Sequence, residues 1–93
     1  MSKKETIPYR ELLLDSRWFI KKAKIIKRDN YRCAICGSLN YLVVHHKQYH
    51  FNERLARKSY PWEYDDKYLI TLCQSCHTAG HNQYEIPVIK INK

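Results

Sequence analysis

The sequence predicts a single small domain of the α+β class, and three observations lead to that prediction. A helical hydrophobic pattern occupies the amino-terminal third, two short β-rich runs lie in the middle, and two CxxC pairs flank those runs. With 93 residues, folding buries only about 60–65% of the surface of the unfolded chain, so a domain of this size often depends on a staple. The cysteines could supply that staple.

The amino-terminal segment is expected to form a basic helix. Residues 1–9 are polar and contain a proline, which predicts a loosely held arm. A helix is predicted over residues 17–28, with Asp15 and Ser16 as a cap, since their side-chain oxygens satisfy the first free N–H groups. Its apolar stripe consists of Trp18, Ile25 and Ile26. This stripe should pack on the core and leave the lysines outside.

Between the cysteine pairs the sequence predicts two strands and a long connection. Residues 41–44 are rich in strand-forming side chains and lead into the adjacent histidines His45 and His46, and residues 68–72 form the second run. The connection over residues 47–67 is aromatic and charged. Connections of this length in compact domains are usually functional or have some structure of their own.

Smaller expectations complete the outline of the fold. We expect a helical turn within residues 52–58, and His50 is expected to be an ordinary loop residue. A helix should run over residues 76–84, since Pro87 cannot continue it. An edge strand is expected over residues 88–91.

The four cysteines predict a structural zinc site. The polar start of the chain has no apolar run of signal-peptide length, so we expect the chain to meet the reducing cytosol, where paired CxxC motifs usually bind metal. Two disulfides or four buried thiols are the alternatives. The expected zinc ligands are Cys33, Cys36, Cys73 and Cys76. No apolar run is long enough to span a bilayer, so no membrane partner is expected.

Four histidines predict a second metal site with room for chemistry. His77 and His81 are four residues apart, so they share one face of the predicted helix, and a strand ending at His45 can bring a third imidazole to them. Three imidazoles leave positions open for water and a phosphate oxygen, as hydrolysis requires. His46 would then be the general base, because an ordinary imidazole pKa of about 6.5 suits this role. Adjacent strand residues point to opposite faces, so both His45 and His46 serve one site only if the strand ends or twists there.

The charge of the chain indicates a nucleic-acid partner. Lys and Arg number 17 against 9 acidic residues, and residues 1–32 hold ten bases and four acids, a local charge of +6 within a total of +8. Such clustering is typical of nucleic-acid binders, although a solvated helix of a basic protein has the same composition. The candidate contacts are Lys21, Lys24, Lys27, Arg28, Lys47, Arg54 and Arg57.

From about residue 18 to residue 81 the chain resembles the HNH endonucleases, which have the ββα-metal fold. The matching stretches are residues 28–37, 44–47, 61–64 and 69–77. The resemblance implies a zinc-stapled, treble-clef-like ββα-metal domain with an N-terminal basic helix. Residues 1–93 would form one HNH nuclease domain with its metal-site core at about 28–84. It also implies an enzyme that hydrolyses DNA phosphodiester bonds with a divalent metal.

The resemblance gives each residue of the two sites a role. His45 would bind the catalytic ion, His46 would activate water, and His77 would be a second ligand. Some members, including the colicin-type nucleases, have a further ligand at the position of His81. The cysteine-bearing members hold a structural zinc. The catalytic ion is expected to be Zn, Ni, Mn or Mg, and imidazole ligands disfavour Mg.

At Tyr68 the chain departs from the family, which has an asparagine there that braces the loop carrying the base. Either Asp65 or Asp66 braces this loop instead, or the site is weakened. Two other functions therefore stay open: a zinc-containing nucleic-acid-binding module without turnover, and a protein-interaction zinc domain that does not bind DNA. The sequence also leaves open whether the protein acts alone, as a homodimer or within a larger restriction or phage assembly.

Overall fold

The computed structural model describes residues 8–83 and 85–92, with the backbone alone for residues 81–83. Its helical elements are α1 (Tyr9–Leu12), α2 (Ser16–Arg28) and α3 (Gln74–Gln83), with the 3-10 turns η1 (Pro61–Glu63) and η2 (Asp66–Tyr68). Its strands are β1 (Leu42–His46), β2 (Tyr49–Asn52), β3 (Arg57–Lys58), β4 (Leu69–Cys73) and β5 (Val88–Ile91). The expected α+β class is confirmed. None of the helices in the described chain combines the length and apolarity needed to cross a membrane.

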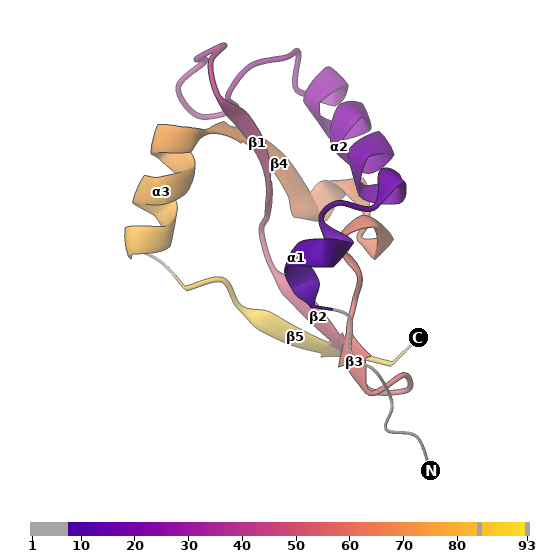
Figure 1. Ribbon diagram of the computed structural model, residues 1–93. Coiled ribbons are helices and arrows are strands. Elements are labelled where there is room, and N and C mark those ends of the chain that lie inside the picture. Colours follow the sequence, from indigo (N-terminus) through magenta and orange to yellow (C-terminus); the bar gives the residue numbers. More distant parts are fainter. Residues whose placement is uncertain (1–7, 84, 93) are drawn as a thin grey trace.

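Two small sheets organise the chain. β1 and β4 form an antiparallel pair in which His46 lies opposite Leu69 and Leu42 lies opposite Cys73. β2 lies between β3 and β5, antiparallel to the first and parallel to the second. Figure 1 shows α2 and α3 on opposite sides of the β1–β4 pair, with the second sheet beyond one end of it. The β1–β4 pair is therefore the layer to which both longer helices attach.

Helix α2 forms where its periodicity and cap predict it. The side chain of Asp15 accepts a hydrogen bond of 2.8 Å from the backbone N–H of Arg17, which satisfies one of the free donors at the helix start. Trp18 is 3% exposed and Ile25 is completely buried. These two side chains pack with Tyr64 and with Leu69 of β4 into the first hydrophobic cluster. The predicted helix and its packing face are confirmed.

A second hydrophobic cluster lies at the cysteine end of the β1–β4 pair. Its buried members are Cys33, Leu72 and Cys73. The side chains of Val43 and Ile70 pack against it, whereas Val44 packs against the first cluster. Leu72 and Cys73 are successive residues of β4 and therefore point to opposite faces, yet both belong to the second cluster. The second cluster thus includes side chains from both faces of this end of the β1–β4 pair, whereas the first cluster takes Val44 and Leu69 from one face.

The connection between β1 and β4 differs from the expectation in two places. The predicted helical turn over residues 52–58 is wrong: β2 and β3 form a hairpin, in which the backbone N–H of Leu55 donates to the side chain of Asn52 and Ala56 has φ of 55°. His50 is buried in β2 rather than lying in a loop, and its backbone N–H donates to the Tyr64 hydroxyl at 3.1 Å. The expected edge strand over 88–91 is present as β5, and it pairs in parallel with β2.

Replacing Ile25 by Ala tests the packing of α2. We expect the Ile25→Ala variant to lose about 2–5 kcal/mol of unfolding free energy in urea, because the removed methyl groups leave a cavity in a fully buried site. The matched control is Ile20→Ala on the same helix, where the side chain is 71% exposed and the change should stay within about 0.5 kcal/mol. Equal losses in the two variants would contradict this packing.

Candidate metal centres

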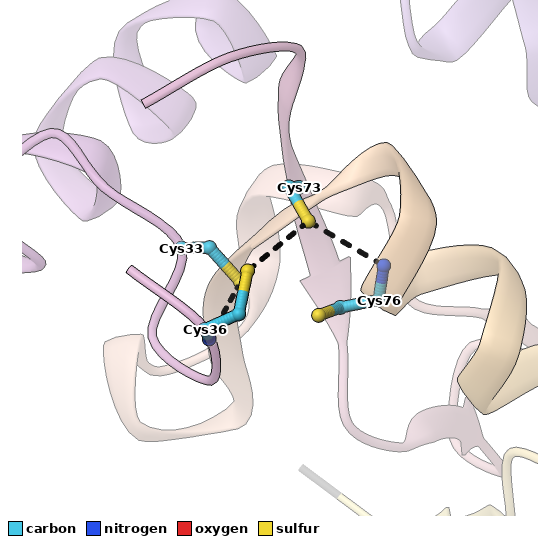
Figure 2. A group of neighbouring side chains, drawn as sticks. All are labelled: Cys33, Cys36, Cys73 and Cys76. Carbon is cyan, nitrogen blue, oxygen red and sulfur yellow. Dashed lines mark hydrogen bonds between the residues drawn. The ribbon is translucent and has the colours of Figure 1, made fainter. Parts of the chain in front are cut away.

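The four cysteines converge on one point in space. Cys33 and Cys36 come from the turn after α2, Cys73 ends β4, and Cys76 lies in the first turn of α3 (Figure 2). Their sulfur atoms all lie within 4.8 Å of one another, and the Cys36 and Cys73 sulfurs are 3.6 Å apart. Zinc–sulfur bonds of about 2.3 Å in a tetrahedron separate the sulfurs by about 3.8 Å. The cluster could therefore hold a structural ion such as zinc, and all four thiols are free of disulfides.

Local backbone geometry turns these thiols inward. Gly37 has φ of 79°, which glycine adopts without strain, and its N–H donates to the carbonyl of Cys33 at 3.0 Å. The N–H groups of Ile35 and Cys36 point at the Cys33 sulfur, at 3.4 and 3.5 Å. On the other side of the cluster, the N–H of Cys76 points at the Cys73 sulfur at 3.5 Å. Each CxxC turn therefore aims at least one backbone N–H donor at a sulfur atom of the cluster.

The thiols of the cluster differ in how readily they ionise. Burial opposes the charge on Cys33, but N–H groups of Cys36, Cys73 and Ile35 outweigh it and lower the pKa of Cys33 to about 6. Hydrogen bonds with the sulfurs of Cys73, Cys33 and Cys36 raise the pKa of Cys76 to about 12. The Cys33 thiolate thus forms easily, and the Cys76 thiol beside it resists a second negative charge. A divalent cation is the partner that removes this resistance.

The predicted second metal site is present in part. His45 of β1 and His77 of α3 lie against each other, with ring centroids 5.1 Å apart and planes at 71°. The third expected ligand, His81, belongs to α3, but its side chain is outside the described residues. In the described chain, the cysteine cluster is the group of three or more metal-ligating side chains that converge. The histidine site therefore stays a prediction, with two of its members in contact.

His46 lies on the other face of β1, because the strand is regular through this residue. Its ring is stacked between Trp18 and Tyr49, at centroid distances of 5.1 and 5.5 Å, and the edge contact with Tyr64 is 4.8 Å. The side chain is only 5% exposed. The predicted condition, a strand that ends or twists at His45, is not met.

Hydrogen bonding fixes the protonation pattern of the His46 ring. Its Nε2 atom lies 3.1 Å from the carbonyl oxygen of Pro61 in η1. A carbonyl only accepts, so Nε2 carries the proton and Nδ1 is the proton acceptor of the neutral ring. Burial lowers the pKa of His46, the charge of Lys58 acts in the same direction, and the Pro61 carbonyl opposes both. His46 is therefore neutral near pH 7.

A cavity of about 370 Å³ brings the three histidines together. All five residues of β1 line it, together with His77 of α3 and side chains of α1 and α2. Because alternate residues of a strand face opposite sides, a cavity lined by five in a row runs along the strand edge. This is the edge of β1 away from β4. His45 and His46 can thus face one space without any break in the strand.

Several of the expected nucleic-acid contacts are engaged inside the protein. Lys21 and Lys24 both pair with Asp66, at 2.7 and 3.2 Å. Arg28 pairs with Asp29 at 2.8 Å, and Arg57 pairs with Glu63 at 3.1 Å and covers the Tyr60 ring. The other candidates, Lys27, Lys47 and Arg54, are exposed. The role of all seven toward a nucleic acid stays a prediction.

These ion pairs attach the η2 segment to α2, next to the position where the family has its bracing asparagine. Asp66 takes both lysines, while Arg28 donates to the carbonyls of Asp66 and Leu69 at 2.7 Å each. The backbone N–H of Lys47 donates to the carbonyl of Tyr68 at 2.8 Å. The residue after His46 is therefore held to η2, and η2 is held to α2. Of the two acidic candidates for a brace, Asp66 makes ion pairs with α2 and Asp65 is exposed, and a bracing role for either stays a prediction.

Two functional contacts were missed by the sequence analysis. The Pro61 carbonyl is a backbone group, for which no residue type gives a signal. Lys22 lines the histidine cavity, whereas the charge pattern singled out its neighbours. Its spacing of four residues from Trp18, which places both on one helix face, could have identified it.

Comparison with known proteins gives no further assignment: no protein-family model, no curated protein and no solved structure matches the chain.

Replacing Cys73 by Ser tests the cysteine cluster. We expect the purified protein to contain about one zinc per chain beyond any ion at the histidines, and the Cys73→Ser variant to lose it and to unfold at lower temperature, because metal-binding energy in such domains is folding energy. Metal content by mass spectrometry and far-UV circular dichroism give the two readouts. The His77→Ala variant is the control and should keep the structural zinc. Full zinc content in Cys73→Ser would contradict the assignment.

The burial of neutral His46 predicts a pH dependence of stability. Its pKa is lower in the folded protein than the unfolded value of about 6.5, so stability is fully present above about pH 6.5 and falls as the pH drops through the folded pKa. One such group contributes a slope of at most about 1.4 kcal/mol per pH unit. Urea unfolding of zinc-loaded wild type and His46→Gln at several pH values measures this slope. The variant should lack the contribution, and identical slopes would contradict the burial of a neutral ring.

Proposed function

We propose that the protein is a metal-dependent HNH endonuclease that hydrolyses DNA phosphodiester bonds. The observation that carries the proposal is the cavity along β1, which is lined by the His45–His77 pair and by His46. A ligand pair for a divalent ion and a neutral imidazole with a defined acceptor atom are the two elements that metal-assisted hydrolysis needs. The order of the matching stretches in the sequence supports the same family.

The first of these two elements is the pair of ion ligands, His45 and His77, with His81 as the expected third ligand. A divalent ion bound there polarises the phosphate and stabilises the charge that develops in the transition state. The β1–β4 pair holds His45, and the first turns of α3 hold His77 next to Cys76. Cys76 of the cysteine cluster and His77 of the histidine pair are thus adjacent residues near the start of α3. A fixed helix start would keep the ligands at a constant separation.

His46 acts as the general base in this proposal. Its Nδ1 atom takes a proton from a water in the cavity as the water oxygen bonds to phosphorus. The bond from phosphorus to the 3′-oxygen breaks, and the 3′-oxygen leaves with the electron pair and takes a proton from solvent. The Pro61 carbonyl, which accepts from Nε2, then stabilises the protonated ring. The stacked rings of Trp18 and Tyr49 keep the imidazole in one orientation, and a lowered pKa keeps it neutral before the reaction.

A specific observation favours a second candidate function. His46 is almost completely buried, which is also what a packing residue of the first hydrophobic cluster would show, and Tyr68 replaces the family asparagine. In that alternative the protein is a zinc-containing nucleic-acid-binding module with no turnover. The nuclease and the binding module differ in what they require of the cavity. In the nuclease, water must reach His46 through the cavity, whereas the binding module has no such requirement.

The deciding experiment is a supercoiled-plasmid nicking assay with zinc-loaded protein and added Mg, Mn, Ni or Zn. We expect nicking with at least one ion, and a fall of about 10²–10⁴-fold in rate for His46→Ala, as for loss of a general base. His50→Ala is the matched control, since His50 is also buried and also contacts Tyr64 but does not line the cavity. Melting temperature and zinc content of both variants exclude simple unfolding.

Undiminished activity in His46→Ala would reject the base assignment. Absence of nicking with every ion, together with salt-sensitive retardation of the plasmid, would reject the nuclease in favour of the binding module. Absence of both would leave the protein-interaction domain.

A further inference from the structure

Four of the six positive charges of α2 divide into two sets with different surroundings. Of the other two, Arg17 pairs with Asp15 and Lys27 is exposed. Lys21, Lys24 and Arg28 lie toward η2 and β4, where Asp66 and Asp29 accept their hydrogen bonds. These cations are matched by acids and contribute to the attachment of the helix. Lys22 lies toward the cavity instead, where it is one of the lining residues together with His45, His46 and His77.

The surroundings of Lys22 contain no acid to match its charge. Its side chain is half-buried, and its ammonium lies 4.5 Å from the centroid of the Phe19 ring and 5.9 Å from that of Trp18. No carboxylate within residues 8–83 and 85–92 forms an ion pair with it. The described lining of the cavity holds one ammonium and three imidazoles, with no Asp or Glu. This composition suits an anion and repels a cation.

Withdrawing an ammonium from water costs free energy unless an opposite charge compensates it. The Phe19 and Trp18 rings give the Lys22 ammonium a partial compensation through cation–π contact. An anionic ligand in the cavity would complete the charge compensation of Lys22. A phosphate in the same cavity would also lie against the His45–His77 pair. Lys22 is thus half-buried, in contact with two aromatic rings, and lines the same cavity as the three histidines.

We infer that Lys22 forms a phosphate-binding subsite of the cavity, with its ammonium on a non-bridging oxygen of the phosphodiester at the histidines. The subsite rests on the proposed function, because the histidine pair defines which phosphate is meant. Lys22 neutralises negative charge on the phosphate as the phosphorus becomes five-coordinate. The ligand of the subsite is a nucleic-acid phosphodiester. Lysine makes such a contact as a point charge, whereas arginine would form two parallel hydrogen bonds.

The test compares Lys22→Met with Lys90→Met. Methionine keeps an apolar stem over Phe19 and removes the charge. Lys90 is an exposed residue of β5 outside the cavity, so its variant matches the change in net charge. We expect kcat for a short duplex to fall about 10- to 100-fold in Lys22→Met, as for loss of a charged hydrogen bond, with a smaller change in KM. Lys90→Met should stay within about twofold of wild type, and Lys22→Arg should recover part of the loss.

A second measurement separates this inference from the proposed function. Fluorescence anisotropy of a labelled duplex, without added catalytic ion, gives the dependence of affinity on salt. Loss of one phosphate contact reduces the slope of log K against log salt by about 0.9. We expect this reduction in Lys22→Met and an unchanged slope in Lys90→Met.

The outcomes are distinguishable. If no ion supports cleavage but the slope falls in Lys22→Met alone, the nuclease proposal fails and the phosphate contact stands. If the wild type cleaves DNA and Lys22→Met matches Lys90→Met in kcat, the subsite is overturned and the nuclease stands. If the slope is unchanged in Lys22→Met and no variant cleaves, both are rejected.

Discussion

Four sulfur atoms from two cysteine pairs, separated by 36 residues of the chain, converge within 4.8 Å of one another, and a metal ion held by them would fix the ends of both longer helices. Cys33 and Cys36 follow α2 directly, while Cys73 and Cys76 span the junction of β4 and α3. The backbone reinforces this junction, since Ala34 donates to the carbonyl of Thr71 and Thr71 donates to the side chain of Asp29. A core of two small clusters offers limited stabilisation to a chain of this length. The cysteine cluster is therefore the constraint that allows the remaining geometry to be fixed.

Local signals in the sequence predicted the elements near this constraint. The cap at Asp15, the stripe of Trp18 and Ile25, and the CxxC spacing each act within a few residues. They therefore identified α2 and the cysteine cluster correctly. The β1 and β4 runs were found for the same reason. For α2, β1 and β4, and for each CxxC turn taken by itself, the residues that determine the structure are close in sequence to the structure they determine.

The contacts that the sequence could not predict are distant ones. Asp66 is 45 residues from Lys21, its ion-pair partner, so the lysines of α2 looked like an open basic face. β5 pairs with β2 at a separation of 39 residues, as between Tyr49 and Val88, and the burial of His50 follows from that pairing and from Tyr64. His46 illustrates the limit best. The adjacent histidines suggested one shared site, whereas a regular strand sends them to opposite faces and only the cavity along its edge unites them.

The packing of His46 would tie two properties of this protein to a single ring. An imidazole held between Trp18 and Tyr49 is part of the hydrophobic interior, and in the proposed function the same ring exchanges a proton with the cavity. A substitution that improves the interior by making this position more apolar removes the exchangeable proton, and one that loosens the ring to expose it weakens the interior. Selection on such a domain could not adjust robustness and reactivity separately at this position. Variation that preserves both would have to occur in the surrounding aromatic side chains.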